Sequence, residues 1–171
     1  MELLEQDVAM AREGDRDAFG RLYNGVAADL YRMALYTLGN PQDAEDVVAE
    51  TFLEAWKGIR GLRDAGSFRQ WMMRILSVRC KRRIAGYIRE RGSIDIDDYI
   101  EDAAPDTTGP RAEVRDAMAR LAPEERQIVL LSVLQGYTMR EIAEMLELPQ
   151  GTVSSKLHRT FKKLRRMLED P

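Results

Sequence analysis

The sequence is poor in the residues on which most catalytic and metal sites depend. It contains one cysteine, Cys80, and one histidine, His158. A single cysteine excludes an intramolecular disulfide and a cysteine-rich zinc site. A single histidine argues against a histidine-based metal centre and against a Ser-His-Asp triad. We therefore expect no metal centre and no catalytic triad built on these residues, and we predict no cofactor.

Long apolar runs are also missing. No stretch approaches the about 20 apolar residues that a membrane-spanning helix needs. The first residues, MELLEQDVAMAREGDRDAF, carry acids where a signal peptide has basic residues, and no apolar core follows them. The sequence thus predicts a soluble cytoplasmic protein without membrane insertion.

Aromatic residues make up only 7% of the chain, whereas hydrophobic residues make up 44% and charged residues 32%. This balance is typical of a globular protein, and the abundance of strong helix formers favours an all-α fold. A chain of 171 residues is long enough for one medium domain or two small ones.

Charges of opposite sign occupy different parts of the chain. The net charge is −6 over residues 1–66, +7 over 67–91, −6 over 92–110 and +2 over 111–171. The overall value of −3 hides this alternation. Such segregation indicates surfaces for different partners rather than one uniform solvated exterior.

Residues 92–110, GSIDIDDYIEDAAPDTTGP, combine six acids with two prolines and two glycines. Prolines, glycines and acids without hydrophobic periodicity are typical of a flexible linker. We therefore predict two small helical domains, at residues 1–91 and 111–171, joined by this acidic linker.

The C-terminal domain has the pattern of a helix-turn-helix. A first helix begins after Pro123, and its apolar positions Ile128, Leu131, Val133 and Leu134 are expected to face a core. A second helix begins with a capping box of Thr138 and Glu141 and ends near Glu147. A third runs from about Pro149 to about Leu168 and is basic. A turn of roughly three or four residues joins the second helix to the third. Two helices joined in this way, the second of them basic, have the pattern of the DNA-binding helix-turn-helix motif.

The third helix divides into faces. Its predicted core stripe consists of Val153, Leu157, Phe161, Leu164 and Leu168. On another face, Thr152, Ser155, Lys156 and Arg159 share the N-terminal part, which a recognition helix presents to base edges. Lys162, Lys163, Arg165 and Arg166 lie further along, where phosphate contacts are expected. A solvated surface helix and a membrane-surface helix are the alternatives; the narrow apolar stripe argues against the second.

Residues 41–60, PQDAEDVVAETFLEAWKGIR, predict an amphipathic helix. One face holds Ala44, Val48, Phe52, Ala55 and Ile59, and the opposite face holds Asp43, Asp46, Glu50 and Glu54. The carboxylates form either a solvated face, a docking surface for a basic partner or, least favoured, a metal site. Leu53 beside them supports docking, because an apolar side chain would be partly exposed there.

Residues 67–84, SFRQWMMRILSVRCKRRI, predict a second long helix with Ser67 as its N-cap. Phe68, Trp71, Met72 and Ile75 form an apolar, aromatic face, and Gln70, Arg74, Ser77 and Lys81 line up on the other side. Arg79, Lys81, Arg82 and Arg83 make a basic cluster. Basic side chains next to aromatic rings suit DNA with unstacked bases, although a core role for Phe68 and Trp71 is the simpler interpretation.

Four segments in order resemble the extracytoplasmic-function sigma factors of bacterial RNA polymerase. AREGDRDAFGRLY resembles the opening helix of that family, DAEDVVAETFLEAW its polymerase-binding motif and GSFRQWMMRI its minus-ten reading segment. LAPEERQIVLLSVLQGYTMREIAEMLELPQGTVSSKLHR is similar to its minus-thirty-five domain. The resemblance covers nearly the whole chain.

The resemblance implies a sigma factor that binds core RNA polymerase and directs promoter-specific initiation. It also implies that the chain is not an enzyme and has no catalytic residue, because the polymerase supplies the chemistry. The implied contacts with the clamp of the largest polymerase subunit are Asp43, Asp46, Val47, Glu50, Leu53 and Glu54. The implied minus-ten contacts, together with the loop at 58–67, are Phe68, Gln70, Trp71, Arg74, Ser77, Lys81 and Arg82. The implied minus-thirty-five contacts are Thr152, Ser155, Lys156, Arg159, Lys162 and Lys163. The linker would enter the interior of the polymerase, and an anti-sigma factor is an expected further partner.

Two positions depart from the family pattern. Val78 stands where the family commonly has an asparagine that helps to recognise minus-ten bases, and Ser154 stands where a basic residue is common. The promoter sequence therefore does not follow from the resemblance. A stand-alone DNA-binding regulator is the competing hypothesis, and a hydrolase or metalloprotein built on the carboxylates is the third.

Overall fold

The computed structural model describes residues 2–91 and 110–169, and within these ranges it contains helices and turns but no strand. The first range holds α1 (Glu2–Arg12), α2 (Arg16–Asn24), α3 (Ala27–Leu38), α4 (Pro41–Gly58), η1 (Ile59–Gly61), η2 (Ala65–Ser67) and α5 (Phe68–Arg91). The second holds α6 (Pro110–Ala119), α7 (Pro123–Val129), η4 (Leu130–Leu134), α8 (Met139–Leu146) and α9 (Gln150–Glu169). The predicted all-α class is confirmed. The predicted linker lies outside the described residues, except for Pro110.

Local sequence signals set several helix ends. Asp15 caps α2, since its carboxylate accepts hydrogen bonds from the backbone N–H groups of Asp17 and Ala18. Asn40 caps α4 in the same way, and Pro41 follows at the first helical position, where its missing N–H costs nothing. Gly39 ends α3 with a φ of 70°, a conformation that glycine adopts without steric strain.

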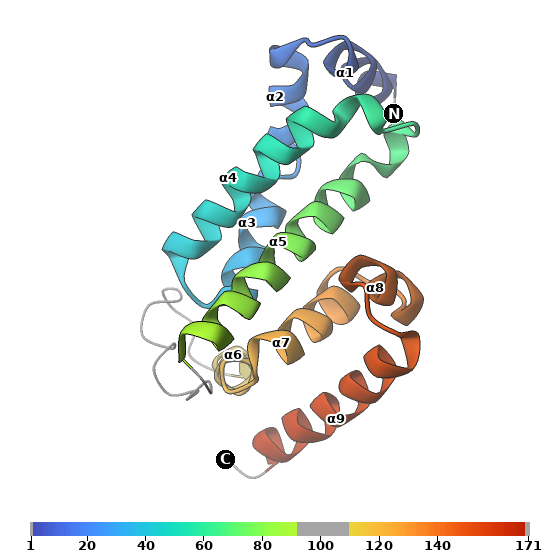
Figure 1. The fold of residues 1–171 in the computed structure, drawn as a ribbon. Helices are drawn as coiled ribbons and strands as arrows, with labels where there is room; N and C mark the ends of the chain where they lie inside the picture. The colour runs from blue at the N-terminus through green and yellow to red at the C-terminus, as the bar shows by residue number, and fades with distance from the viewer. Residues whose placement is uncertain (1, 92–109, 170–171) are drawn as a thin grey trace.

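The N-terminal unit, α1 to α5, is built around two long helices. Figure 1 shows α4 and α5 running side by side, with α3 against them and α1 and α2 at one end. An ion pair of 2.6 Å between Arg21 and Asp7 joins α2 to α1, and another of 2.6 Å between Arg69 and Asp29 joins α5 to α3. The apolar face predicted for α4 is confirmed: Ala44, Val48, Ala55 and Ile59 are buried and Phe52 packs against the core.

Helix α5 is longer than predicted. The pattern predicts an end near residue 84, whereas the helix continues to Arg91. Ile84 and Tyr87 are buried in this continuation, so apolar contacts stabilise the extra turns. The buried side chains of α5 also lie on two sides of the helix, because the N-terminal unit covers one side and the C-terminal unit, α6 to α9, covers another.

The C-terminal unit contains the predicted helix-turn-helix. Thr138 and Glu141 form the capping box of α8: the Thr138 hydroxyl accepts from the Glu141 N–H at 3.2 Å, and the Glu141 carboxylate accepts from the Thr138 N–H at 2.8 Å. Residues 147–149 form the turn, with Glu147 in the left-handed region. The Pro149 carbonyl then accepts from the N–H groups of Thr152 and Val153 at the start of α9. The predicted end of the second helix near Glu147 and the predicted start of the third at about Pro149 are both confirmed.

The predicted core stripes of two helices in this unit are partly wrong. Val133 and Leu134 are 66% and 48% exposed. Val133 follows the buried Leu131 by two residues and therefore lies on the opposite side of the helix. Leu134 belongs to a π-helical turn in which the Gln135 N–H donates to the Leu130 carbonyl, and this wider turn changes the direction in which the Leu134 side chain points. On α9, Phe161 and Leu168 are exposed, whereas Val153 and Leu157 are buried and Leu164 packs against the core.

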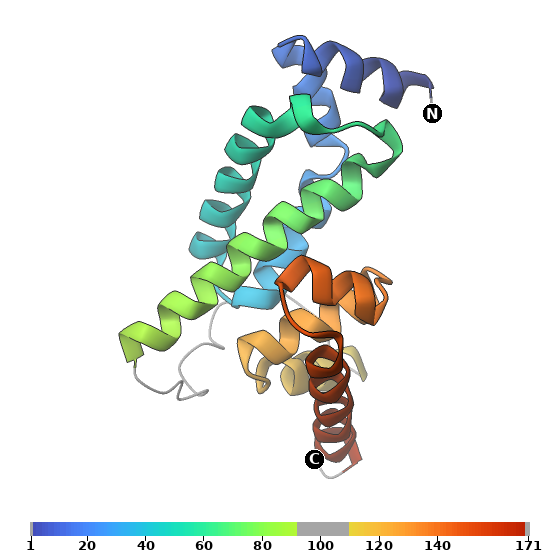
Figure 2. The same cartoon turned by 45° about the vertical axis from the view of Figure 1, so that its right-hand side comes forward.

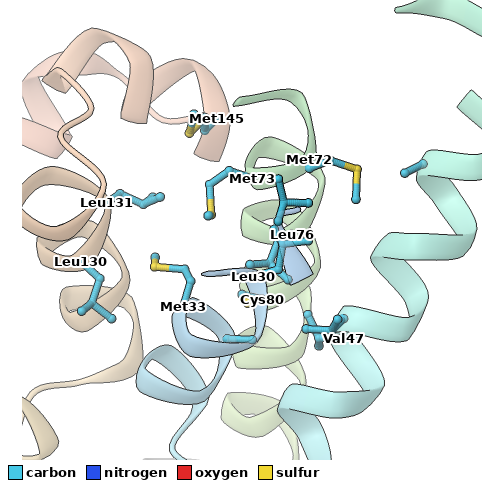
Figure 3. Close-up of a cluster of buried hydrophobic side chains, with 14 of the residues drawn as sticks. Leu30, Met33, Val47, Met72, Met73, Leu76, Cys80, Leu130, Leu131 and Met145 are labelled. Atoms are coloured by element: carbon cyan, nitrogen blue, oxygen red, sulfur yellow. The ribbon is translucent and has the colours of Figure 1, made fainter. Parts of the chain in front are cut away.

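The two units share one continuous group of buried side chains. Figure 3 shows Met73 of α5 and Met33 of α3 beside Leu130 and Leu131 of η4, with Met145 of α8 close by. Two polar contacts cross the same boundary: the Gln127 amide donates to the Ser77 carbonyl at 2.8 Å, and the Lys81 ammonium donates to the Leu146 carbonyl. We call this boundary, formed by α3 and α5 on one side and α7, η4 and α8 on the other, the unit interface.

Candidate polymerase and promoter interfaces

The predicted docking stripe on α4 is largely occupied by cations of α5. Arg79 pairs with Glu54 at 2.5 Å and with Glu50 at 3.5 Å, and Arg83 pairs with Asp43 and with Glu50, each at 3.3 Å. The Tyr87 hydroxyl also donates to the Asp43 carboxylate. These carboxylates therefore hold α4 against α5, and much of their charge is compensated inside the protein.

The exposed part of α4 is narrower than the predicted stripe. Asp46 is exposed, and no ion pair is found for it among the described residues. Leu53 is 55% exposed, as its position beside the stripe predicts. Val47 is buried, so the predicted direct contact of this side chain with a partner is not available in this structure. Glu45 is exposed next to Asp46 and was not predicted. We call Glu45, Asp46 and Leu53 the α4 patch.

The predicted minus-ten residues on α5 differ in how far they are exposed. Gln70, Arg74 and Arg82 are exposed, and Trp71 is half-buried. Phe68 is buried and lies 6.1 Å from the Trp71 ring between centroids, so the core interpretation holds for Phe68. Ser77 and Lys81 lie at the unit interface, where Lys81 is half-buried.

The structure corrects the prediction that Ser77 lies on an exposed minus-ten face. Its side chain is buried, and its hydroxyl donates to the Met73 carbonyl one turn earlier at 2.7 Å. The helical spacing with Arg74 and Lys81 is correct, but the C-terminal unit covers this part of the face. A one-sided helix pattern cannot reveal a second packing surface on the same helix.

The loop between α4 and α5 is ordered by its own side chains. Asp64 accepts hydrogen bonds from the Gly66 N–H at 3.0 Å and from the Ser67 hydroxyl at 2.8 Å. Ser67 directly precedes α5, as predicted, but its hydroxyl bonds back to Asp64. Arg60 and Arg63 are exposed on this loop, which leaves two cations next to the start of α5.

The predicted reading positions of α9 share the exposed side of the helix-turn-helix. Ser155, Arg159 and Lys162 are exposed, and Thr152 is half-buried near the N-terminal end. Two lysines are held by the N-terminal glutamates of α7: Lys156 pairs with Glu124 at 3.1 Å and Lys163 with Glu125 at 2.5 Å. These pairs fix α9 against α7 and lower the net positive charge of the reading face, which the sequence pattern did not indicate.

Cys80 and Arg126 are buried titratable residues. Burial raises the pKa of Cys80 on α5 to about 12, with a smaller opposing effect from Arg83. Burial lowers the pKa of Arg126 on α7, and its Nε has no hydrogen-bond partner within the described structure. In the described ranges no group of three or more His, Cys, Asp and Glu side chains is arranged to hold a metal ion, and no helix is long and apolar enough to cross a membrane.

Comparison with known proteins agrees with this arrangement. The family model for sigma-70 region 2 matches residues 22–103, and the model for sigma-70 region 4 matches residues 111–164. The chain is similar to the ECF RNA polymerase sigma factor SigL of Mycobacterium tuberculosis, with 34% identity over 87% of this chain and 88% of that protein. It is similar to SigM of the same organism, with 31% identity over 98% of this chain and 83% of that protein.

Among solved structures, the fold is similar to that of the sigma factor RpoE in complex with the anti-sigma factor NepR from Bartonella quintana. The TM-score is 0.67 at 21% identity, over 89% of this chain and 97% of that one. The first matched region includes α3 to α5 of the N-terminal unit, the second includes the helix-turn-helix, and the alignment with SigL covers 87% of this chain. This chain therefore belongs to the ECF sigma factors of bacterial RNA polymerase.

Proposed function

We propose that this chain binds core RNA polymerase through the α4 patch and places two DNA-reading helices, α5 and α9, on a promoter. The polymerase supplies the chemistry, and the chain has no catalytic activity of its own. It acts where the polymerase acts, in the cytoplasm. The observation that carries the proposal is the exposed side of the N-terminal half of α9, with Ser155 and Arg159, which follows a capped helix and a three-residue turn.

The minus-thirty-five element is assigned to Thr152, Ser155, Lys156 and Arg159 of α9. Hydroxyl, ammonium and guanidinium groups donate to guanine and to phosphate oxygens, so this set suits both base edges and backbone. Lys162 and Lys163 lie further along the helix, where phosphate contacts are expected.

The minus-ten element is assigned to exposed polar side chains of α5 and its preceding loop, namely the cations Arg60, Arg63, Arg74 and Arg82 and the neutral amide of Gln70. Trp71 is half-exposed beside them and offers a ring on which an unstacked base can lie. The position of Trp71 near the loop between α4 and α5 supports a role in holding the separated strands of the promoter DNA.

A stand-alone DNA-binding regulator would share α9 but would not need the α4 patch. The substitution Asp46→Arg distinguishes the two, because it reverses the charge of an exposed side chain for which no ion pair is found among the described residues. A matching change at Glu50 is less suitable, because Glu50 pairs with both Arg79 and Arg83 and its loss would disturb the packing of α4 on α5.

We expect Asp46→Arg to weaken binding to core polymerase by at least about tenfold, the effect of one unfavourable charge at an interface. Glu13→Arg is the matched control, since Glu13 is exposed after α1, outside the α4 patch, and undergoes the same charge reversal. Binding is measured by fluorescence anisotropy of labelled protein with core polymerase. Equal affinity of Asp46→Arg and wild type would exclude the α4 patch as the docking surface.

Control by an anti-sigma factor is part of the proposal. The similar RpoE was solved in complex with the anti-sigma factor NepR, and we propose a partner of the same class for this chain. Such a partner would compete with the polymerase for the sigma factor, so its addition should reduce initiation in proportion to the sigma factor it binds.

A further inference from the structure

We propose that Gly58, at the end of α4, is a positioning residue for Trp71 of α5. The missing side chain leaves room for the indole, which is thereby held in one orientation for stacking on an unstacked base of the minus-ten DNA. The inference rests on the proposed function, because it concerns the ring that this function assigns to the minus-ten element. It deepens that function by naming the residue that sets the orientation of the ring.

The backbone does not require a glycine at this position. Gly58 has a φ of −96° and a ψ of −7°, a right-handed conformation that residues with a side chain also adopt, whereas Gly39 at the end of α3 has a φ of 70°. Gly58 is also exposed, so burial does not limit the size of its side chain. Because glycine destabilises a helix relative to alanine, its presence here calls for a reason other than backbone geometry.

The space beside Gly58 is occupied by the indole of Trp71. A Cβ atom added to Gly58 would lie 3.4 Å from Cζ2 and 4.0 Å from Cη2 of this ring. Apart from the adjoining residues and the backbone of its own helix, no other heavy atom of the described residues lies within 4 Å of that Cβ position. The Cβ atom alone would make an ordinary van der Waals contact, whereas the two methyl groups of a valine would compete with the ring for space.

A second contact holds the indole from its own helix. Phe68 lies one turn before Trp71, with a distance of 6.1 Å between the ring centroids and an interplanar angle of 47°. Phe68 is buried and is therefore fixed by the core. Trp71 itself is half-buried and packs against that core. Contacts from α4 and α5 thus fix one part of the indole, while another part stays accessible.

The residues around the accessible part suit single-stranded DNA. Arg74 is exposed one turn after Trp71, and Arg60 and Arg63 are exposed on the preceding loop. Basic side chains around an aromatic ring bind backbone phosphates, while the ring stacks on a base of any type. A ring that is already oriented loses less conformational entropy when the base binds, which strengthens the binding. Gly58 contributes to this binding through the ring.

The first test follows the ring itself. The chain contains two tryptophans, Trp56 and Trp71, so labelling with fluorotryptophan gives two fluorine NMR signals, and Trp71→Phe identifies one of them. We expect Gly58→Val to shift the Trp71 signal and to increase its response to solvent, because the valine methyl groups displace the ring. An unshifted Trp71 signal in this variant would overturn the positioning role.

The matched control is Gly20→Val on α2. An added Cβ atom at Gly20 has no heavy atom within 4 Å among the described residues outside its own helix backbone, so this variant should leave the Trp71 signal in place. If circular dichroism shows that Gly58→Val loses helix, Gly58→Thr takes its place, because it has the same branched shape and a hydroxyl that suits an exposed helix end.

The second test measures what the orientation of the ring contributes to binding. A labelled single-stranded oligonucleotide of mixed sequence is titrated with the full chain. Loss of one base–aromatic stack should weaken binding by roughly tenfold in Trp71→Ala, and we expect a loss of several-fold in Gly58→Val. Gly20→Val should bind like the wild type. In the double variant of Gly58→Val with Trp71→Ala the two losses should not add, because Gly58 acts through the ring.

Three outcomes of this titration would overturn the inference: additive losses in the double variant, equal affinity of Gly58→Val and the wild type, or no binding by the wild type. Neither measurement uses polymerase, so a failure of the proposed function in transcription assays stays distinguishable from a failure of this inference.

Discussion

At the scale of the residue, identical side chains have different roles according to what packs on them. Ser155 is exposed on α9, whereas Ser77 is buried beneath Gln127. Lys162 is exposed, whereas Lys81 is held by a helix-end carbonyl. Residue type and spacing predicted all four as DNA contacts, and only the tertiary structure separates them.

Cys80 provides a prediction at this scale. Burial raises the pKa of its thiol from 9.0 to about 12, so the reactive thiolate is nearly absent in the folded protein at pH 8. We expect iodoacetamide to label Cys80 slowly in buffer and rapidly in denaturant. Equal labelling rates in the two solutions would contradict the burial.

The same shift gives a pH dependence. Below pH 9 the thiol is protonated in both folded and unfolded chains, so its contribution to folding stability is complete. Between pH 9 and about 12 the unfolded chain loses the proton while the folded chain keeps it, so the free energy of unfolding falls as pH rises. Burial also raises the pKa values of Tyr23 and Tyr137, which adds to the trend. Urea unfolding across this pH window measures it, and stability that rises through the window would contradict the assignment.

At the scale of the element, helix periodicity correctly predicted that these segments of the chain form helices. The capped start of α8, the turn before α9 and the apolar face of α4 all follow from local sequence. The errors have two physical causes. The π-helical turn at η4 changes the side that Leu134 faces, and α5 packs on two sides where one apolar face was predicted. Neither cause leaves a signal in residue spacing.

The ion pairs between α7 and α9 give a prediction at this scale. Glu124→Gln keeps the shape of the side chain but releases Lys156, and it removes a negative charge near the reading face. We expect several-fold tighter binding of duplex DNA at low salt, with a loss of stability below about 1 kcal/mol because the pair is partly exposed. Anisotropy titrations and urea unfolding measure the two effects.

Glu113→Gln is the control for that comparison, since Glu113 is exposed on α6 and undergoes the same loss of charge. Equal DNA affinity of the two variants would show that Glu124 does not restrain Lys156 in solution.

At the scale of the whole molecule, the sequence predicted two helical units, but not how the units pack. That packing depends on pairs such as Ser77 with Gln127, which are far apart in the chain and carry no local pattern. The pairing of the α4 carboxylates with Arg79 and Arg83 escaped prediction for the same reason. The domain boundaries at residues 91 and 111 stay predictions.

The shared core gives a prediction for the molecule as a whole. Leu131 is buried at the unit interface, so Leu131→Ala should reduce stability by about 2–5 kcal/mol and accelerate hydrogen exchange in α3 of the other unit. Val153→Ala removes a buried side chain of α9 and is the control, with no expected effect on α3. Exchange in α3 that is unchanged by Leu131→Ala would show that the units do not stabilise each other.

Transcription in vitro measures the proposed role of the molecule without knowledge of its promoter. Core RNA polymerase, a genomic promoter library and purified chain without any inhibitor are combined, and transcript start sites are sequenced. We predict a set of start sites that requires the wild-type chain, persists with Glu13→Arg and is lost with Asp46→Arg. The absence of any start site that depends on the wild-type chain would contradict its role as a sigma factor.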